Sequence, residues 1–276
     1  TGILYLCATP IGNLGDMTPR VVETLRSVDL IAAEDTRNSL KLMTHFEIHT
    51  PMTSYHEYNK VEKAYTLIAK LQEGQNIALI TDAGTPAISD PGEVLVRMCL
   101  EAGIRVTSLP GAAACITALT MSGLSTRRFC FEGFLSVSKK SRFEHLNSLK
   151  PEQRTMVFYE APHKLLSTLK DMLSVFGNRK ISICRELTKI HEEVFRTTLS
   201  QAVEYYTVNK PKGEFVLVIE GAKDEDLVKA ETIEDAFLQV KALVDKGMRG
   251  ADACKEIAKA TSFSKGELYA MLLQDK

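Results

Sequence analysis

Two short polar clusters contain side chains that could take part in acid–base chemistry. The stretch EDTR contains Glu34, Asp35 and Arg37, and the stretch YHEYN contains His56 and Glu57. Carboxylates and imidazoles can accept protons, and the ordinary pKa of an imidazole lies nearest neutrality. For any one of these residues alone, a solvated surface position or a structural ion pair is the simpler interpretation. Together, as two clusters near glycine-rich loops, they are candidates for a substrate role.

Four loops of unusual composition follow predicted strands. Glycine lets a backbone approach a ligand, and proline fixes the shape of a loop in advance. The carboxyl ends of parallel strands share one sheet edge, so these loops should converge on one crevice. The loops are ATPIGNLGD (8–16), AEDTRN (33–38), TDAGTPAISDPG (81–92) and LPGAAA (109–114). They contain neither G-x-G-x-x-G nor a P-loop, which favours a ligand without phosphates.

Alternating strands and helices must position these loops, and this alternation predicts a largely parallel sheet. The expected strands are Ile3–Ala8, Leu30–Ala33, Asn76–Thr81 and Arg105–Leu109. The expected helices are Pro19–Ser27, Ser39–Phe46, Val61–Glu73 and Gly92–Ala102. A turn at Pro110 and Gly111 then leads into an alanine-rich helix.

The pattern restarts after Gly123. Strands are expected at Phe129–Leu135, Thr155–Tyr159, Ile181–Cys184 and Phe215–Glu220, with helices at Lys139–Leu149, Lys164–Phe176 and Ser200–Tyr206. The acidic run AKDED from Ala222 predicts a linker, followed by helices at Ile233–Lys246, Ala251–Ala260 and Ser264–Leu272. We therefore expect α/β domains over residues 1–123 and 124–221, and a linker with a helix-turn-helix-like tail over residues 222–276.

The composition is that of a soluble globular protein, with 276 residues, 45% hydrophobic and 25% charged. The formal net charge of −1 excludes a global basic field, so any nucleic-acid site must be a local patch. The sequence contains no run of 18 apolar residues, so no membrane partner is expected. Six scattered cysteines without a C-x-x-C pair indicate a reduced, cytoplasmic protein. His45 and His49 are four residues apart but lack the other ligands of a metal site, so no metal is expected.

One local segment, STRRFCFEGFLSVSKKSR (125–142), is strongly basic. Its aromatic residues, Phe129, Phe131 and Phe134, are interpreted mainly as core positions of a strand rather than as base-stacking platforms. The basic residues are candidates for RNA phosphate contacts: Arg127, Arg128, Lys139, Lys140 and Arg142. The helical tail is either a packing unit or a second RNA contact through Lys255, Lys259 and Lys265.

Several stretches together resemble the tetrapyrrole-methylase superfamily: YLCATPIGNLGDMTPR, IAAEDTRNSLKLM, SYHEYN, LITDAGTPAISDPG, LPGAAACITAL, FEGFL and YEAPHKLLSTL. The chain is more similar to the ribosomal-RNA branch, because TPIGN stands where porphyrin-modifying relatives typically have G-x-G-P-G-D. The resemblance covers nearly the whole chain. It implies a cofactor cleft between two α/β domains, a small helical C-terminal appendage and a homodimer.

The resemblance implies S-adenosylmethionine-dependent 2′-O-methylation of a cytidine in 16S rRNA, expected within the 30S subunit. It places the cofactor on Pro10, Asp82, Ala83, Gly84, Pro86, Ala112, Ala113, Ala114, Tyr159, Glu160, Gly213, Glu214 and Phe215. The acceptor hydroxyl must lose a proton, so we expect Glu34, Asp35 and Arg37 to orient the ribose and His56 or Glu57 to complete the site. Two alternatives remain open: methylation of a tetrapyrrole or protein residue on the same scaffold, and a non-catalytic RNA-binding module with a vestigial cofactor pocket.

Overall fold

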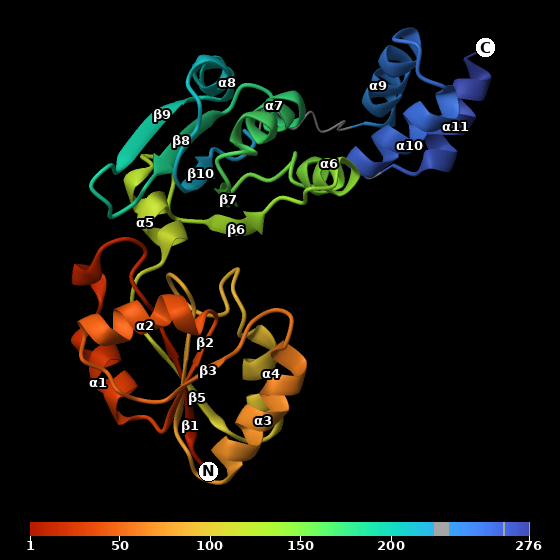
Figure 1. Ribbon diagram of the computed structural model, residues 1–276. Coiled ribbons are helices and arrows are strands. Elements are labelled where there is room, and N and C mark those ends of the chain that lie inside the picture. Colours follow the sequence, from red (N-terminus) through yellow and green to blue (C-terminus); the bar gives the residue numbers. More distant parts are fainter. Residues whose placement is uncertain (224–231, 262, 276) are drawn as a thin grey trace. The chain divides into compact units, whose positions relative to one another are not determined.

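The computed structural model describes residues 1–223, 232–261 and 263–275 (Figure 1). The chain divides into two compact units, Thr1–Gly221 and Ala222–Lys276. The acidic residues of the predicted linker lie outside the described residues. The second unit contains α9 (Ile233–Asp245), α10 (Gly250–Ala260) and α11 (Lys265–Gln274), packed around a small apolar core. None of the helices in the described ranges is long and apolar enough to cross a membrane.

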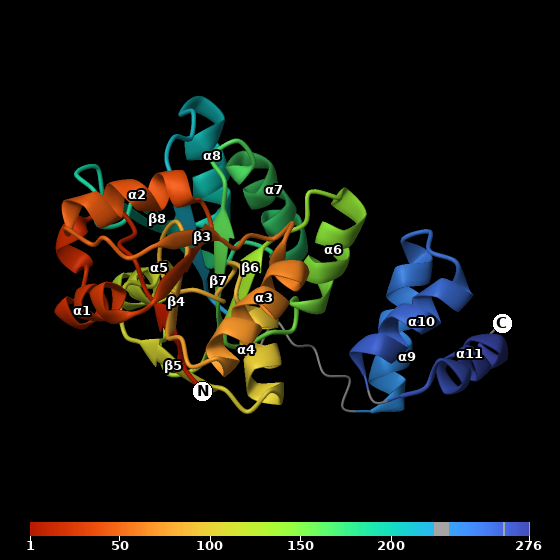
Figure 2. The ribbon, with the colours of Figure 1, turned by 60° about the horizontal axis from the view of Figure 1, so that its bottom comes forward.

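The first sheet is parallel throughout, as predicted. Its strands are β1 (Ile3–Cys7), β2 (Leu30–Ala33), β3 (Met52–Ser54), β4 (Ile77–Ile80) and β5 (Arg105–Leu109), in the order β3-β2-β4-β1-β5. Helices α1 (Pro19–Ser27) and α2 (Thr36–His45) pack on one face, and α3 (Lys60–Gln72) and α4 (Glu93–Glu101) pack side by side on the other (Figures 1 and 2). The short strand β3 was missed by the sequence pattern.

Local sequence explains how these elements form. Thr18 caps α1 by accepting a hydrogen bond from the Val21 N–H at 3.3 Å, and Pro19 occupies the first helical position. All four residues of β4, Ile77–Ile80, are buried because helices cover both faces of the sheet.

The strand order creates a crevice between β1 and β4. After β1 the chain passes to α1 on one face, whereas after β4 it passes to α4 on the opposite face. The loops after these neighbouring strands therefore diverge. Such a switch point is the usual ligand position in open α/β sheets.

The second sheet is mixed. Its strands are β6 (Phe129–Phe134), β7 (Thr155–Glu160), β8 (Lys180–Arg185), β9 (Glu193–Thr198) and β10 (Phe215–Ile219), in the order β6-β7-β10-β8-β9. Strands β6 and β7 are parallel, but β10 is antiparallel to both neighbours and β9 is antiparallel to β8. The restarted pattern therefore does not give a second parallel sheet. The reason is that β9, which the sequence pattern missed, returns directly from β8.

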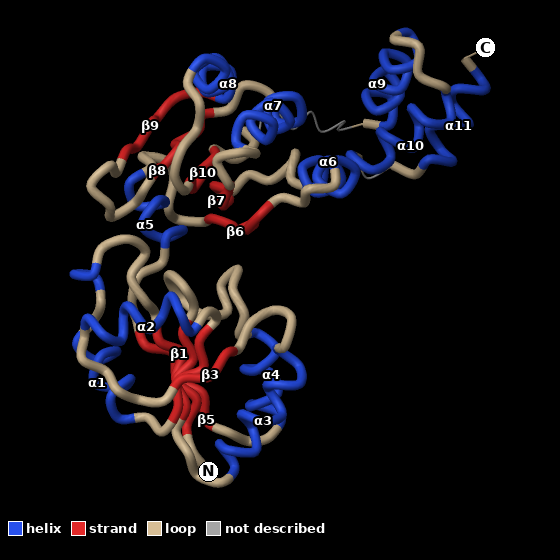
Figure 3. Tube along the Cα trace, in the orientation of Figure 1, coloured by secondary structure: helices blue, strands red, loops and turns tan. Residues whose placement is uncertain are grey.

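Helices cover both faces of this second sheet (Figure 3). Helices α6 (Lys139–Ser148), α7 (Leu165–Phe176) and α8 (Leu199–Val208) pack on one face. Helix α5 (Ala114–Met121) packs on the other face, against β7 and β10. Since α5 directly follows β5, it links the loops of the first sheet to the second sheet.

Candidate active site

A cavity of about 370 Å³ lies where the loops of the first sheet meet the second sheet. Its volume is within the range typical of small-molecule sites. The lining is mainly apolar and contains three acidic residues, Asp90, Glu160 and Glu214. The full lining is Ile11, Ala83, Gly84, Thr85, Ile88, Asp90, Ala113, Ala114, Phe134, Tyr159, Glu160, Ala161, Pro162, Leu187, Glu214, Phe215 and Val216.

Hydrogen bonds join the four loops of the predicted crevice to one another. Thr9 and Gly84 exchange backbone hydrogen bonds of 2.9 and 3.0 Å across the loops after β1 and β4. The Thr85 hydroxyl donates to the Ala112 carbonyl at 2.9 Å, which joins the loop after β5. The Asn38 amide donates to the Asp82 carboxylate at 3.1 Å, which joins the loop after β2. The predicted convergence of these loops is therefore confirmed.

Gly84 shapes the wall of the cavity. Its N–H and C=O are both bonded to Thr9, so they are committed within the protein. Its φ of +80° is a conformation that side chains disfavour. A Cβ added here would lie 3.5 Å from Cγ2 of Ile11. The positive φ, rather than crowding, is therefore the main reason that this point of the cavity wall favours glycine.

The loop after β4 is strained around an acidic side chain, Asp90. Two residues other than glycine have a positive φ in this loop, Ala87 at 67° and Ser89 at 63°. Such strain persists only where surrounding structure imposes it, and it often marks functional loops. Burial, and then the charges of Glu34 and Asp82, raise the pKa of Asp90 to about 7.

Tyr159 connects β7 to the start of α5. Its hydroxyl oxygen accepts a hydrogen bond from the Cys115 N–H at 3.1 Å. Its ring makes edge contacts with Phe131 and Phe134, at centroid distances of 4.9 and 5.5 Å. Burial raises the pKa of Tyr159, so the hydroxyl stays protonated at neutral pH.

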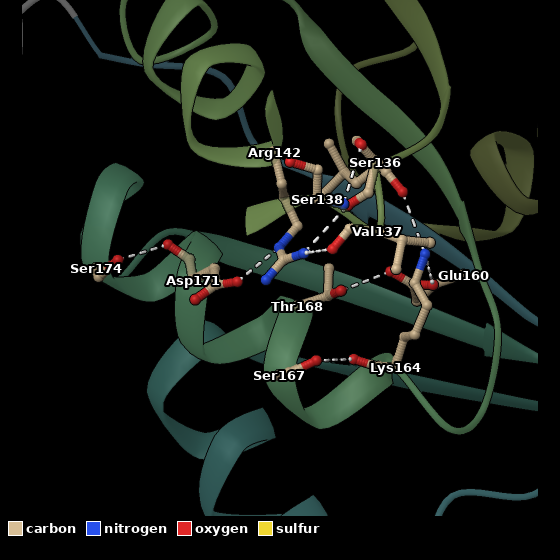
Figure 4. Close-up of polar contacts among 11 residues, drawn as sticks. Ser136, Val137, Ser138, Arg142, Glu160, Lys164, Ser167, Thr168, Asp171 and Ser174 are labelled. Atoms are coloured by element: carbon tan, nitrogen blue, oxygen red, sulfur yellow. Dashed lines mark hydrogen bonds and ion pairs between the residues drawn. The ribbon is translucent and has the colours of Figure 1, made fainter. Parts of the chain in front are cut away.

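Glu160 lines the cavity, but its carboxylate is used within the protein (Figure 4). It accepts hydrogen bonds from the Thr168 hydroxyl at 2.5 Å and the Ala161 N–H at 2.8 Å. Lys164 lies 3.5 Å from the same carboxylate. These contacts hold the start of α7 against the end of β7.

Arg142, predicted to contact phosphate, is also committed within the protein (Figure 4). Its guanidinium pairs with Asp171 at 2.7 Å and donates to the carbonyls of Ser136 and Val137 at 3.1 and 3.0 Å. The Arg142 and Asp171 side chains are only 13% and 17% exposed. These contacts join α6 to α7 and leave Arg142 less available for a phosphate than the other basic candidates. The other basic candidates, Arg127, Arg128, Lys139 and Lys140, are exposed.

Three of the catalytic candidates lie in ion pairs near the surface. Asp35 caps α2 and pairs with Arg37 through two hydrogen bonds, of 2.8 and 3.1 Å. Hydrogen bonds from Arg37 lower the pKa of Asp35 to about 2, which makes its carboxylate a poor base. Glu57 pairs with Lys60, the first residue of α3, and the Glu57 side chain is 64% exposed.

Glu34 and His56 lie in a less exposed setting. One Glu34 oxygen accepts a hydrogen bond from the Asp82 N–H at 3.3 Å. Burial raises the pKa of Glu34, while the neighbouring His56 acts to lower it. Nδ1 of His56 is buried and has no hydrogen-bond partner among the described residues. The structure therefore brings together these two members of the predicted clusters.

The predicted cofactor residues divide into two groups. Those that line the cavity are Ala83, Gly84, Ala113, Ala114, Tyr159, Glu160, Glu214 and Phe215. Pro10, Asp82, Pro86, Ala112 and Gly213 are adjacent in the chain to lining residues but do not line it themselves. Asp90 was not among the predicted cofactor residues, although it lies in the loop that the sequence marks with glycine and proline. Leu187 and Pro162 gave no signal, because β8 and β7 bring them here from distant parts of the chain.

Comparisons with known proteins agree with this architecture. The model of the "Tetrapyrrole (Corrin/Porphyrin) Methylases" family matches residues 4–203. A Synechocystis protein named ribosomal RNA small subunit methyltransferase I is 53% identical over 99% of this chain and 98% of its own length. A Haemophilus influenzae protein of the same name is 47% identical over 98% and 95%. The crystal structure of diphthine synthase, 12% identical, has the same fold, with a TM-score of 0.62 over 80% of this chain and 90% of that one. The predicted fold and resemblance are thus confirmed, and the chain belongs to the tetrapyrrole methylase family, together with these rRNA methyltransferases.

Proposed function

We propose that this protein transfers a methyl group from S-adenosylmethionine to the 2′-hydroxyl of a cytidine in 16S rRNA of the small ribosomal subunit. The observation that carries this proposal is the cavity at the β1–β4 switch point, in a chain about half identical, over its full length, to proteins named as small-subunit rRNA methyltransferases. The alternatives, a tetrapyrrole or protein substrate and a non-catalytic RNA-binding module, are tested below.

The cavity suits this methyl donor. Apolar walls from Ile11, Leu187 and Val216 can enclose uncharged parts of the molecule. Asp90 can face a cationic part, because its carboxyl group lines the cavity among other acidic groups. When bound, the donor supplies a methyl carbon activated by a sulfonium, so its leaving group needs no proton.

We propose that Glu34 accepts the proton of the acceptor hydroxyl. It is a partly buried carboxyl group, with its pKa raised, next to Asp82 at the end of β4. His56, whose charge favours the ionised form of Glu34, completes the pair. Asp35, Arg37 and Glu57 are better explained as surface ion pairs. General bases contribute about 10²–10⁴-fold to rate.

The exposed basic residues beside β6 support RNA binding. Lys139 and Lys140 occupy the first turn of α6, where a positive charge is unfavourable to the helix dipole. Arg127 and Arg128 precede β6, which is an edge strand of its sheet. Lysines that lower the stability of their own helix are typical of a binding site. We therefore keep Arg127, Arg128, Lys139 and Lys140 as proposed phosphate contacts.

Methyl transfer from radiolabelled donor tests the proposal. The substrates are a naked 16S transcript, assembled 30S subunits and porphyrin precursors. We expect label in RNA, with 30S subunits as the preferred substrate. Alkaline hydrolysis should leave the label in a resistant dinucleotide, because strand cleavage requires a free 2′-hydroxyl. Labelling of porphyrin, or RNA binding without transfer, would support an alternative.

The same proteins test the catalytic assignment. Glu34→Gln and His56→Ala should lower the single-turnover rate by about a hundredfold or more, with donor affinity intact. Asp35→Ala and Glu57→Ala are matched controls and should stay within about tenfold of wild type. If Glu34→Gln behaves like the controls, transfer depends on positioning alone.

The proposal also includes a homodimer and a cytoplasmic location. Light scattering in solution tests the dimer, and cell fractionation tests the location. All six cysteines are free thiols, as suits a reducing compartment.

A further inference from the structure

Phe134 is not a core residue, although the sequence pattern predicts that it is. Its side chain is 55% exposed, yet it lines the cavity. The ring therefore extends from the cavity to the surface. Phe129 is also exposed, at 37%, so the core interpretation is wrong for both residues. Only Phe131 packs against the core.

A β-bulge in β6 places Phe134 on the cavity side. Cys130 pairs with Met156 and Phe131 with Val157, but the next paired residue is Gly133, opposite Phe158. Glu132 is thus an extra residue, and everything after it moves to the opposite face of the sheet.

The two faces of the sheet show the consequence. Cys130 packs on the α6–α8 face, whereas Phe131 and Tyr159 pack on the α5 face. Regular alternation would put Phe134 on the same face as Cys130. The bulge instead pairs it with Tyr159, and its ring contacts the Tyr159 ring edge-on at 5.5 Å.

Several contacts fix this bulge. Gly133 has a φ of +63°, which glycine adopts readily. The Glu132 carboxylate lies 2.9 Å from Nε2 of His145 on α6. A Cβ added to Gly133 would lie 3.3 Å from the Ser89 hydroxyl, so the strained loop after β4 packs directly against the bulge. The position of Phe134 is therefore well defined before any ligand binds.

We propose that the Phe134 ring is the stacking surface for the unstacked base of the nucleotide that is methylated. This inference rests on the proposed function. RNA-binding proteins hold splayed-out bases on aromatic rings beside basic residues that contact the backbone. Ile88, at 43% exposure, lines the cavity together with Phe134, and the exposed Val137, Lys139 and Lys140 follow Phe134 in the chain. The exposure of the ring favours the RNA base over the enclosed methyl donor.

The test compares Phe134→Ala with Phe134→Tyr, which keeps an aromatic ring, and with Phe129→Ala as a control on the same strand before the bulge. Phe134→Ala should raise KM for the rRNA substrate by about 5- to 100-fold, as expected for the loss of one stacked base. Phe134→Tyr and Phe129→Ala should stay close to wild type. Donor affinity measured by calorimetry should be unchanged in Phe134→Tyr and Phe129→Ala. In Phe134→Ala it should fall by a much smaller factor than the rise in KM for rRNA, since the ring also lines the cavity.

An RNA substrate that lacks the base at the target nucleotide gives the decisive comparison. Wild type and Phe134→Ala should then have equal KM values, because neither has a base to stack. A penalty that persists with the abasic substrate, an unchanged KM with normal RNA, or an equal loss of donor affinity would each overturn the inference. Wild-type protein that methylates no rRNA would overturn the proposed function as well, so the two failures are distinguishable.

Discussion

Replacing Asp90 by asparagine should weaken donor binding in a pH-dependent way. Asp90 lines the cavity, and burial together with the charges of Glu34 and Asp82 raises its pKa to about 7. A cationic donor favours the ionised form. If only the ionised form binds tightly, the apparent Kd exceeds the Kd of that form by a factor of about 11 at pH 6 and about 1.1 at pH 8. Wild-type affinity should therefore rise about tenfold over this interval.

The variant should lose this dependence on pH. A hydrogen bond to a charged group contributes roughly 1.5–3 kcal/mol, so Asp90→Asn should bind the donor about 10- to 100-fold more weakly at pH 8. At pH 6, where most wild-type molecules carry a proton on Asp90, the difference should be about tenfold smaller. Calorimetric titration with S-adenosylmethionine across this range measures both effects.

Thermal stability provides an independent readout of the same group. Because the folded-state pKa is raised from 3.8 to about 7, the folded protein keeps this proton where the unfolded chain has lost it. The free energy of unfolding therefore falls as pH rises from about 4 to about 7. The folded protein stays destabilised by the same amount at higher pH. Asp90→Asn should melt at a higher temperature than wild type at pH 8, with little difference near pH 4.

Asp82→Asn is the matched control. It removes one of the charges that raise the pKa of Asp90. It should therefore move the midpoint of the affinity profile to lower pH and keep the profile's shape. The reasoning is refuted if Asp90→Asn retains the wild-type affinity profile, or if its melting temperature falls at pH 8.

Four further variants test the cavity wall and the basic surface. Gly84→Val should abolish donor binding, whereas Gly103→Val, also at positive φ but with nothing within 4 Å of an added Cβ, should only lower the melting temperature; calorimetry showing equal affinities would contradict this. Replacing Lys139 and Lys140 by alanine should flatten the log–log salt dependence of RNA binding by about 0.7–0.9 per lost phosphate contact, and an unchanged slope would make them a solvated surface. Arg142→Ala should destabilise the fold by on the order of 3 kcal/mol in denaturant titrations, because it leaves Asp171 unpaired. The salt dependence of RNA binding should not change. A flatter salt dependence with unchanged stability would instead support Arg142 as a phosphate contact.

The first sheet could be predicted because its signals are local. The run Ile77–Ile80 is wholly apolar because helices cover both faces, and Thr18 with Pro19 marks the start of α1. Glycine and proline in the loops after β1, β4 and β5 then indicated which loops form the crevice. The short strand β3 was missed, since three partly buried residues carry no clear pattern.

The second sheet was harder to predict because its arrangement depends on distant pairings. Strand β10 lies between β7 and β8, although β9 and α8 separate it from them in the chain. No local pattern specifies that position. The bulge at Glu132 is likewise not specified by any local pattern. Its one extra residue reverses the face of the sheet on which Phe134 lies.

Residue type alone also could not separate the polar candidates, since burial and partners decide their roles. Glu34 and Asp35 are neighbours in the chain, yet burial raises the pKa of one and Arg37 lowers the pKa of the other. Helix α2 begins immediately after them, so Asp35 serves as its cap and turns toward Arg37. Glu34 turns instead toward Asp82 at the end of β4. The start of a helix thus commits one carboxylate of the pair to a structural role, and the other, Glu34, is the one that we propose as the base.

The loop after β4 shows how the chain gives up stability to form the cavity. Ala87 and Ser89 each adopt a left-handed conformation that costs roughly 1–2 kcal/mol, and Asp90 adds a carboxyl group that is costly to ionise. Glycine at positions 87 and 89 would remove the backbone strain but would also free the loop. A freer loop would no longer hold Asp90 in the cavity or Ser89 against the bulge at Gly133. The strain is therefore best understood as the cost of fixing, before ligands bind, both the acidic wall of the proposed donor cavity and the strand end that carries Phe134.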